Sequence, residues 1–282
     1  MNPTKPYVRR IPAMLLSIFA ALWALITLYP IFVALISSFK VNDEIFGAMF
    51  RFPRNWHFEN YVKAMTVAKM GRAILNSTFV TAVSTALLIV ISSMASYSLA
   101  RSTFRFTKSI YLLFIFGILL PIHATLIPLA KMVSRMPFLK SNSFTTLILI
   151  YAAFQLPISI FIITGYMKSI SRDLDDAARI DGCGPWWSFV HVIFPLSKPA
   201  VSTSAIIAFL FIYNELIFAV VFLSDQAKYT ISLAMLQFVG YRQVQMGPIY
   251  ASIVLAVIPM VIIYLLFQSQ IQKGMTAGAV KG

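Results

Sequence analysis

The sequence predicts an all-α membrane protein built from six transmembrane helices. Of its 282 residues, 59% are hydrophobic and only 11% are charged, whereas soluble domains typically carry about a quarter charged residues. The apolar residues gather in repeated runs long enough to cross a bilayer as helices, roughly 20 residues each. These runs do not alternate polar and apolar residues, which argues against a transmembrane β-barrel.

The six predicted spans form one membrane domain over residues 1–282. They run at about 12–37, 73–100, 110–131, 144–167, 200–223 and 247–269. The first two are separated by a long polar segment, 40–72, whose aromatic residues and FPRNW turn predict a folded external loop at the membrane surface. Prolines inside or near the spans each remove a backbone donor and are expected to kink their helices. They are Pro30, Pro121, Pro128, Pro157 and Pro259.

Span number and charge together predict how the chain sits in the membrane. Six spans place both termini on one side. Three basic residues lie in the short segment 101–108, and Lys5, Arg9 and Arg10 precede the first span. Because short basic loops favour the cytoplasmic side, we expect both termini in the cytoplasm. The apolar stretch 11–39 is too long for the core of a cleaved signal peptide, about 7–15 residues, and is expected to remain as the first helix.

Composition and spacing argue against several functional classes. The net charge is +14, but no basic run exceeds two residues, so nucleic-acid binding is not indicated. Cys183 is the only cysteine, which excludes an intrachain disulfide. The histidines, His57, His123 and His191, show no metal-ligand spacing, and no metal site or catalytic residue is expected.

The polar segment 170–199 between the fourth and fifth spans predicts a helix–turn–helix. Asp173 is the expected N-cap of a first helix, with acids in the first turn where negative charge suits the helix dipole. Gly182 stands where a helix end favours a left-handed residue. Gly184 and then Pro185 open a second helix, since proline suits the first helical position. This segment is predicted to lie on the cytoplasmic face.

The side chains of this loop predict contact with a protein. Ala177 and Ala178 offer a slim face that can enter a groove, and Trp186, Trp187 and Phe189 supply an apolar patch too rich for a loop that faces only water. The alternative is an amphipathic element on the lipid surface. Four aspartates within nine residues disfavour that alternative, because cytoplasmic leaflets are anionic.

Polar residues within the spans predict a hydrated interior. Glu215 is the only acidic residue in any of the six spans, and a carboxylate in a membrane is costly. A substrate or ion contact and a structural role, paired with a base or protonated, both stay open for it. Other polar residues are as well explained by hydrogen bonds between helices; they are Asn76, Ser84, Thr85, His123, Gln155 and Asn214.

Residues 175–198 (DDAARIDGCGPWWSFVHVIFPLSK) resemble the Glu-Ala-Ala loop of ABC importer permeases. That pattern is Glu-Ala-Ala, two residues, an acid and a glycine, followed later by a hydrophobic-Pro step. Asp176 stands where the motif has Glu, which keeps the charge and shortens the side chain by one methylene. The other matching positions are Ala177, Ala178, Asp181, Gly182 and Phe194-Pro195.

Other segments carry the same resemblance. YNEL (213–216) is similar to a Trp-Asn-Glu stretch in the fifth helix of carbohydrate permeases, with Tyr213 replacing Trp. The segment LPIHATLIPLAKM (120–132) and the tail QKGMTAGAVKG (272–282) are similar to MalG-like permeases. The chain is therefore identified as a member of the MalG-like branch of carbohydrate ABC permeases.

The resemblance implies a subunit of an ATP-driven sugar importer in a bacterial or archaeal cytoplasmic membrane. A second, MalF-like permease would form the other half of the path, and two copies of a cytoplasmic ATPase and an external solute-binding protein would complete it. ATP and Mg would bind to the ATPase, since this sequence contains no G-x-x-x-x-G-K-[ST] loop. This chain would bind no cofactor and catalyse no reaction itself.

Two groups of residues are expected to carry the function. The unit 173–195 would dock in a cleft of the ATPase and act as a rigid lever, and the tail 274–282 would reach the ATPase as an extended strand. The residues expected to couple to the ATPase are Asp175, Asp176, Ala177, Ala178, Asp181, Gly182, Pro185, Trp186 and Pro195. Sugars bind through aromatic faces and polar hydrogen bonds, and the residues predicted for the substrate path are Tyr151, Gln155, Tyr213, Asn214 and Glu215.

Two rival functions are weaker. A secondary transporter or channel with a conduit around Glu215 and no ATPase partner would explain the kinks but leaves the 170–199 loop without a role. A membrane enzyme would need Asp, His or Cys clustered for metal or acid–base chemistry, and the acidic cluster at 173–181 lacks a histidine.

Overall fold

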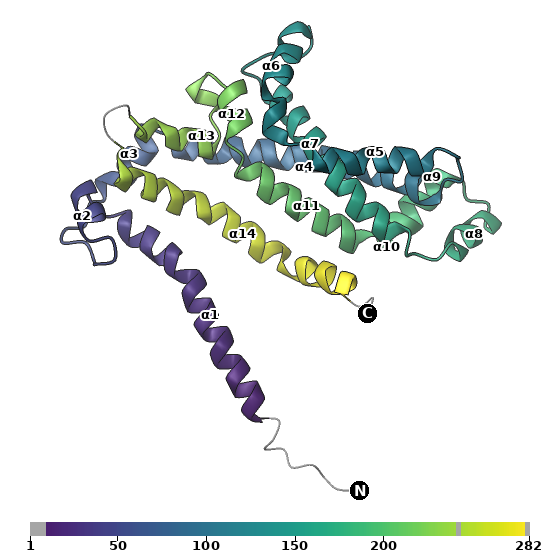
Figure 1. The fold of residues 1–282 in the computed structure, drawn as a ribbon, viewed down its shortest axis with the longest axis horizontal. Helices are drawn as coiled ribbons and strands as arrows, with labels where there is room; N and C mark the ends of the chain where they lie inside the picture. Colours follow the sequence, from purple (N-terminus) through teal and green to yellow (C-terminus); the bar gives the residue numbers. More distant parts are fainter. Residues whose placement is uncertain (1–9, 241–243, 280–282) are drawn as a thin grey trace, which may run out of the picture. The chain divides into compact units, whose positions relative to one another are not determined.

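The computed structural model describes residues 10–240 and 244–279, which form a series of helices joined by loops (Figure 1). Among these described residues the only β pairing is one antiparallel bridge between Val239 and Val244. The backbone divides into two compact units. Unit 1 comprises Met1–Met70 and Met235–Ile258, and unit 2 comprises Gly71–Ala234 and Pro259–Gly282. The single domain predicted over 1–282 stays a prediction, and each unit is described by itself.

Unit 1 contains the first long helix and a folded loop. Its helices are α1 (Arg10–Ser37), α2 (Asn42–Gly47), α3 (Glu59–Thr66), η4 (Leu236–Phe238) and the first turns of α14 (Met246–Ala279). Every side chain of α1 from residue 14 to residue 32 is exposed, as expected for a helix that contacts lipid or another protein. Lys5 and Arg9, which favoured a cytoplasmic N-terminus, lie outside the described residues.

The segment 40–72 is folded, as the sequence predicts. The Phe39 ring packs against the rings of Trp56, Phe58 and Tyr61, with centroids 5.1–5.2 Å apart. The Tyr61 hydroxyl also lies 2.8 Å from the Ser38 hydroxyl. These contacts bring the end of α1 against the start of α3.

Unit 2 holds the remaining helices. They are α4 (Met70–Arg101), α5 (Thr107–Leu119), η1 (Ile122–Thr125), α6 (Leu126–Arg135), α7 (Phe144–Met167), α8 (Asp173–Ile180), α9 (Pro185–Ser188), η2 (Phe189–Ile193), α10 (Phe194–Leu196), α11 (Lys198–Tyr213), α12 (Ile217–Phe222), η3 (Gln226–Lys228) and α13 (Ile231–Met235). The helix α7 begins and ends at the residues predicted for the fourth span and packs against both α5 and α11. Its buried side chains Leu147 and Tyr151 join Ile212 and Phe218 in the larger apolar core of the unit.

The predicted third span is not one straight helix. The helix α5 ends at Leu119, and the chain resumes through η1 and α6 after a bend of 95°. Pro121 explains the break: the residue before a proline is driven out of the helical region, and Leu120 is extended, with φ −72° and ψ 128°. Pro30, Pro157 and Pro259, by contrast, lie within continuous helices.

The predicted fifth span is also interrupted. Its helix α11 ends at Tyr213, and the short α12 begins only at Ile217. The helix formed by Pro185–Leu196 is bent from α11 by 75°. Among the described residues, four helices are long and apolar enough to cross a membrane, and six segments are if each bent pair counts as one span.

The all-α membrane fold predicted from the sequence is thus confirmed, with two of its spans bent. The tail predicted as an extended strand is instead helical as far as Ala279, because α14 continues through it. The remaining residues of that tail, 280–282, lie outside the described residues.

Candidate functional site

The first helix of the 170–199 loop begins one residue earlier than a cap at Asp173 predicts. Arg172 is the N-cap, and Asp173 is the first helical residue. The Ser171 hydroxyl lies beside that terminus, donating to Asp173 Oδ2 (2.8 Å) and accepting from the Asp173 N–H (3.3 Å). Asp173, Asp175 and Asp176 therefore occupy the first turn, where their charge is favourable for the dipole of α8.

The turn between the two helices is a Schellman motif centred on Gly182. Gly182 has φ +80°, its N–H donates to Arg179 O (3.0 Å), and the next N–H, of Cys183, donates to Ala178 O (2.9 Å). These are the two bonds that define the motif. A Cβ on Gly182 would meet no atom within 4 Å, so the backbone conformation, and not lack of space, requires glycine here.

The second helix of the loop starts as predicted but is not regular. Gly184 is extended and Pro185 begins α9, which continues through a single π-helical turn, η2, into α10. Pro195 donates no N–H to the preceding turn, and π turns commonly accommodate such a disruption within a helix. Phe189 and Ile193 of this turn are buried and pack with Met167 of α7 in a second apolar cluster.

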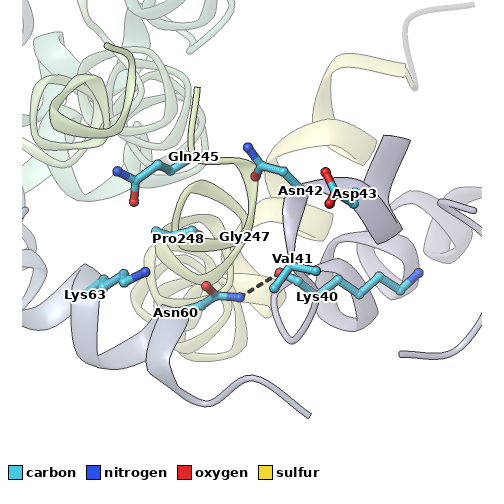
Figure 2. A pocket seen from close by; sticks show the side chains of 9 residues that line it. All are labelled: Lys40, Val41, Asn42, Asp43, Asn60, Lys63, Gln245, Gly247 and Pro248. Carbon is cyan, nitrogen blue, oxygen red and sulfur yellow. Dashed lines mark hydrogen bonds between the residues drawn. The ribbon is translucent and has the colours of Figure 1, made fainter. Parts of the chain in front are cut away.

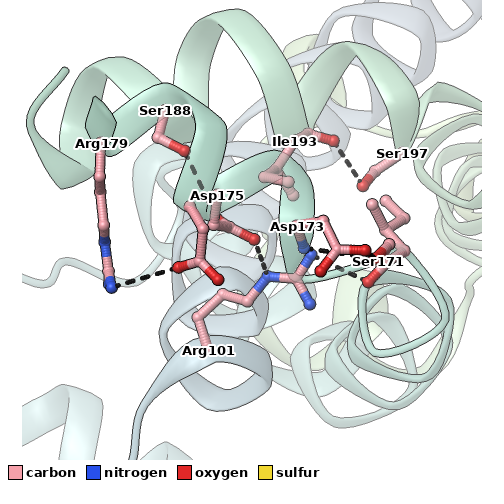
Figure 3. Close-up of polar contacts among 10 residues, drawn as sticks. Arg101, Ser171, Asp173, Asp175, Arg179, Ser188, Ile193 and Ser197 are labelled. Carbon is pink, nitrogen blue, oxygen red and sulfur yellow. Dashed lines mark hydrogen bonds and ion pairs between the residues drawn. The ribbon is translucent and has the colours of Figure 1, made fainter. Parts of the chain in front are cut away.

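An ion pair fastens the loop to the end of α4 (Figure 3). Arg101 Nε lies 2.8 Å from Asp175 Oδ2, and both side chains are only 11% exposed. Arg101 Nη2 also donates to Ile170 O (3.2 Å), and the Ser188 hydroxyl donates to Asp175 Oδ1 (3.4 Å). Helix α8 is therefore tied to α4 directly, and the end of α9 is tied to it through Asp175.

This arrangement buries two of the predicted coupling residues. Asp175 is held in the Arg101 pair and Ala178 is only 6% exposed, so neither lies on the surface of this chain, and a coupling role stays a prediction for both. The slim face predicted from two alanines is reduced to Ala177, which is exposed. The sequence did not single out Arg101, although a basic residue that ends a membrane span was the available signal.

The other predicted coupling residues are exposed, and they are Asp176, Ala177, Asp181, Gly182, Pro185, Trp186 and Pro195. Apolar side chains accompany them on the loop: Ile180 is 87% exposed and Trp186 is 64% exposed. Asp176 pairs only loosely with Arg179, at 3.7 Å on the surface. Exposed acids beside large apolar side chains suit a protein–protein contact.

Two of the residues predicted for the substrate path, Tyr151 and Glu215, are bonded to each other. The Tyr151 hydroxyl donates to Glu215 Oε2 (2.7 Å). The same carboxylate accepts from the backbone N–H groups of Phe218 (3.0 Å) and Ala219 (3.3 Å). Glu215, 8% exposed, thus satisfies the first N–H groups of α12. Its geometry is that of a structural residue, one of the two roles the sequence left open.

The remaining predicted path residues are close to this pair in the chain: Gln155 lies one turn after Tyr151, and Tyr213 and Asn214 directly precede Glu215. Tyr213 is 3% exposed and stacks on Phe209 with ring centroids 5.6 Å apart. Asn214 is exposed and donates to Leu210 O (2.8 Å). Gln155 is buried beside a cavity in the wall of unit 2. A role in the path stays a prediction for all of them.

Unit 1 contains a polar cavity of about 360 Å³ near the start of α14 (Figure 2). Asn60 is buried in its wall and donates to Ser38 O and Lys40 O, both at 2.9 Å. Asn42 Oδ1 accepts from the Met246 N–H (2.9 Å) and so caps α14. A Cβ on Gly247 would lie 2.5 Å from both Lys40 O and Asn60 Nδ2, so this glycine permits the close approach of α14.

Lys40 is buried, and no carboxylate of the described residues lies within ion-pair distance of its ammonium. Its ammonium donates to Met49 O (2.8 Å) and Ala48 O (3.3 Å), just beyond the end of α2. Burial lowers the pKa of Lys40, and the negative charge of Glu44 opposes this shift. Among the described residues no group of three or more His, Cys, Asp or Glu is placed to hold a metal ion.

Comparison with known proteins places these features in context. Residues 89–277 match the family of the binding-protein-dependent transport system inner membrane component. The chain is 32% identical to the diacetylchitobiose uptake system permease protein NgcG of Streptomyces coelicolor, over 92% of this chain and 86% of that protein. It is 32% identical to the melibiose/raffinose/stachyose import permease protein MelC of Bacillus subtilis, over 95% and 96% respectively.

Solved structures share the fold. A bacterial ABC transporter that imports the acidic polysaccharide alginate contains a chain that superposes with a TM-score of 0.76 at 20% identity, covering 95% of this chain and 99% of that one. The alginate transporter in complex with its substrate-bound periplasmic protein gives a TM-score of 0.66 at 16% identity, covering 91% and 92%.

Proposed function

Because the chain belongs to the family of binding-protein-dependent transport system inner membrane components, it is a membrane permease subunit and not itself an enzyme, and we propose that it forms half of the path of an ATP-driven sugar importer. Sugar as cargo is supported by the relatives, whose names describe uptake of diacetylchitobiose and of melibiose, raffinose and stachyose. The rival function was a secondary transporter or channel with a conduit around Glu215 and no ATPase. It has less support, since the Glu215 carboxylate already accepts hydrogen bonds from the backbone of α12.

The observation that carries the coupling proposal is the construction of the 170–199 loop. Its inner side is fixed to α4 through the Arg101–Asp175 pair and to α7 through the cluster of Phe189 and Ile193. Its outer side leaves acids and two tryptophans exposed. The loop is fixed to the membrane helices on its inner side and exposes groups that can bind a partner on its outer side. It can therefore pass a partner's movement to those helices.

In this proposal a cytoplasmic ATPase dimer grips the loop and supplies the energy. ATP and Mg would bind to that ATPase, and the loop and both termini would face the cytoplasm. A second permease would complete the path, and its membrane helices and lipid are suited to cover the exposed apolar side chains of α1. The external solute-binding protein would deliver the sugar.

Two experiments test the proposal. The tagged chain, purified from its own membrane in mild detergent, should bring down an ATPase; its repeated absence would overturn the importer. Deleting the chain should abolish growth on one of the sugars named for its relatives, such as melibiose or diacetylchitobiose, when that sugar is the sole carbon source. Normal growth on each of the relatives' sugars would overturn sugar import.

A further inference from the structure

A second cavity, of about 370 Å³, lies in the wall of unit 2 and is lined by residues of α5, α7 and α11. Among the described residues that line it, Gln155 carries the only polar side chain, and the others are apolar or aromatic. Sites for small molecules usually have this composition, with a few polar groups fixed in a mostly apolar wall. We call it the Gln155 cavity.

Within the described residues, the amide of Gln155 takes part in no hydrogen bond. The residue is only 5% exposed, so the protein itself leaves little solvent to satisfy this amide. Buried amides are normally paired. The neighbouring Tyr151, one turn earlier on α7, is bonded to Glu215. The amide of Gln155, by contrast, is left for a group that enters the cavity.

Pro157 removes one helical hydrogen bond from the same stretch of α7. It lies inside α7 and has no N–H, so the carbonyl of Ala153, one turn earlier, receives no bond from it. Ala153 lines the cavity together with Gln155. The cavity therefore offers an amide, which both donates and accepts, in a wall where α7 also has a carbonyl without its helical donor.

The position of the cavity at the middle of a membrane helix indicates what kind of ligand it can bind. Gln155 lies at the middle of α7, the helix Phe144–Met167, where the only lipid groups are acyl chains, which form no hydrogen bonds. A sugar ring presents hydroxyl groups for the amide and the carbonyl, and C–H groups for the aromatic side chains of Phe154 and Phe211 in the same wall. The volume is at the small end of the range for ligand sites, roughly 300–1,000 Å³, which suits one ring.

We propose that the Gln155 cavity is a subsite of the translocation path and holds one ring of the sugar in transit. Gln155 hydrogen-bonds its hydroxyl groups, and Phe154 and Phe211 contact its apolar face. Tyr151 and Glu215 belong to the supporting wall and do not touch the sugar. The subsite rests on the proposed function of sugar import.

The test uses the complete transporter, purified with its ATPase and binding protein and arrested with ATP and vanadate. The probes are radiolabelled melibiose and diacetylchitobiose. Gln155→Leu keeps a side chain of similar size and removes the amide. The arrested variant should bind the sugar with roughly tenfold lower affinity, the effect of losing about one hydrogen bond. The sugar affinity of Gln155→Asn, which has a shorter amide side chain, should lie between those of the wild type and Gln155→Leu. The matched control is Gln268→Leu on α14, where the amide donates to Leu265 O at an exposed position.

Each outcome decides the matter. Reduced retention in Gln155→Leu, with a wild-type melting temperature and wild-type behaviour of Gln268→Leu, supports the subsite. Sugar retention and uptake equal to wild type in Gln155→Leu would overturn the subsite while leaving sugar import intact. A wild-type transporter that takes up neither probe into proteoliposomes would overturn sugar import and the subsite together. A phospholipid that is lost only in Gln155→Leu, with sugar retention unchanged, would assign the cavity to lipid and overturn the proposal.

Discussion

The loop at 40–72 in unit 1 and the loop at 170–199 in unit 2 are both polar, but they use their polar side chains differently. In the first, Lys40, Asn42 and Asn60 each donate to backbone carbonyls of unit 1. In the second, Asp175 is the one aspartate held by a buried ion pair, and the other acids stay exposed.

The difference shows how to separate a structural loop from one that contacts a partner. Polar side chains that donate to the chain's own carbonyl groups stabilise the loop. They leave few unbonded polar groups for a partner to contact. Exposed acids beside exposed tryptophans contribute little to the fold beyond their favourable interaction with a helix dipole, so their exposure needs another explanation. The following changes test this distinction, because the buried groups should control stability and the exposed ones should control coupling.

The largest effect is expected for Asp175→Ala. Removing the carboxylate leaves Arg101 as a buried, unpaired cation, which typically costs about 3–5 kcal/mol. We expect a strongly destabilised 170–199 loop, seen as faster proteolysis within the loop and as loss of sugar-stimulated ATP hydrolysis in the reconstituted complex. Arg101→Met combined with Asp175→Leu should recover much of the stability, because no charge is then left unpaired.

The matched control for that change is Asp176→Ala. Asp176 forms only an exposed pair with Arg179, which contributes at most about 1 kcal/mol, so protease resistance should stay at the wild-type level. Coupling should fall, because Asp176 stands in the motif position. Equal loss of stability in Asp175→Ala and Asp176→Ala would contradict the division into a buried inner side and an exposed outer side.

A smaller effect is expected in unit 1 for Gly247→Ala. The new Cβ would lie 2.5 Å from the Lys40 carbonyl oxygen and from Asn60 Nδ2, so backbone must shift, and overpacking of this kind costs about 1–3 kcal/mol. Limited proteolysis of the 40–72 loop reports the change. Gly47→Ala is the control, since a Cβ there meets nothing within 4 Å. A Gly247→Ala chain with wild-type protease resistance would show that the approach of α14 is looser than described.

The turn of the 170–199 loop gives the next prediction. Gly182→Val places a β-branched residue at φ +80°, which we expect to cost about 1–2 kcal/mol from backbone strain alone. Gly182→Asn should be milder, since Asn tolerates left-handed backbone. Gly184→Ala, at φ −72°, should leave coupling unchanged. Measuring sugar-stimulated ATP hydrolysis in all three separates strain from bulk, because a Cβ meets no atom at either glycine.

The features that the sequence predicted well are local ones. Gly182 predicts the end of one helix and Pro185 the start of the next, because each residue has a distinctive backbone preference. The bounds of α7 follow from an uninterrupted apolar run. Pro121 was expected to kink a span, but the size of the bend, 95°, goes with the packing of α5 on α7 and of α6 on α12, which a single proline does not specify.

The features that the sequence missed depend on residues far apart in the chain. Nothing near Asp175 indicates that Arg101 will pair with it, so four aspartates looked equally exposed. Glu215 looked like a path residue because a carboxylate in a span is costly, and only the position of Tyr151 and the start of α12 show that its oxygens are already bonded. Long-range pairing therefore decided which predicted site residues are free to act.

The smallest effect concerns Lys40 and pH. Burial lowers the pKa of Lys40 in the folded state, so the unfolded chain keeps this proton to a higher pH. Between the two pKa values the unfolded state binds more protons, and the stability of unit 1 should rise with pH by about 1.4 kcal/mol for each pKa unit that separates them. A chain with Trp56 as its only tryptophan reports unfolding beside Phe39. Lys40→Met in that chain should lack this rise, and an identical pH slope in both chains would show that Lys40 is not desolvated.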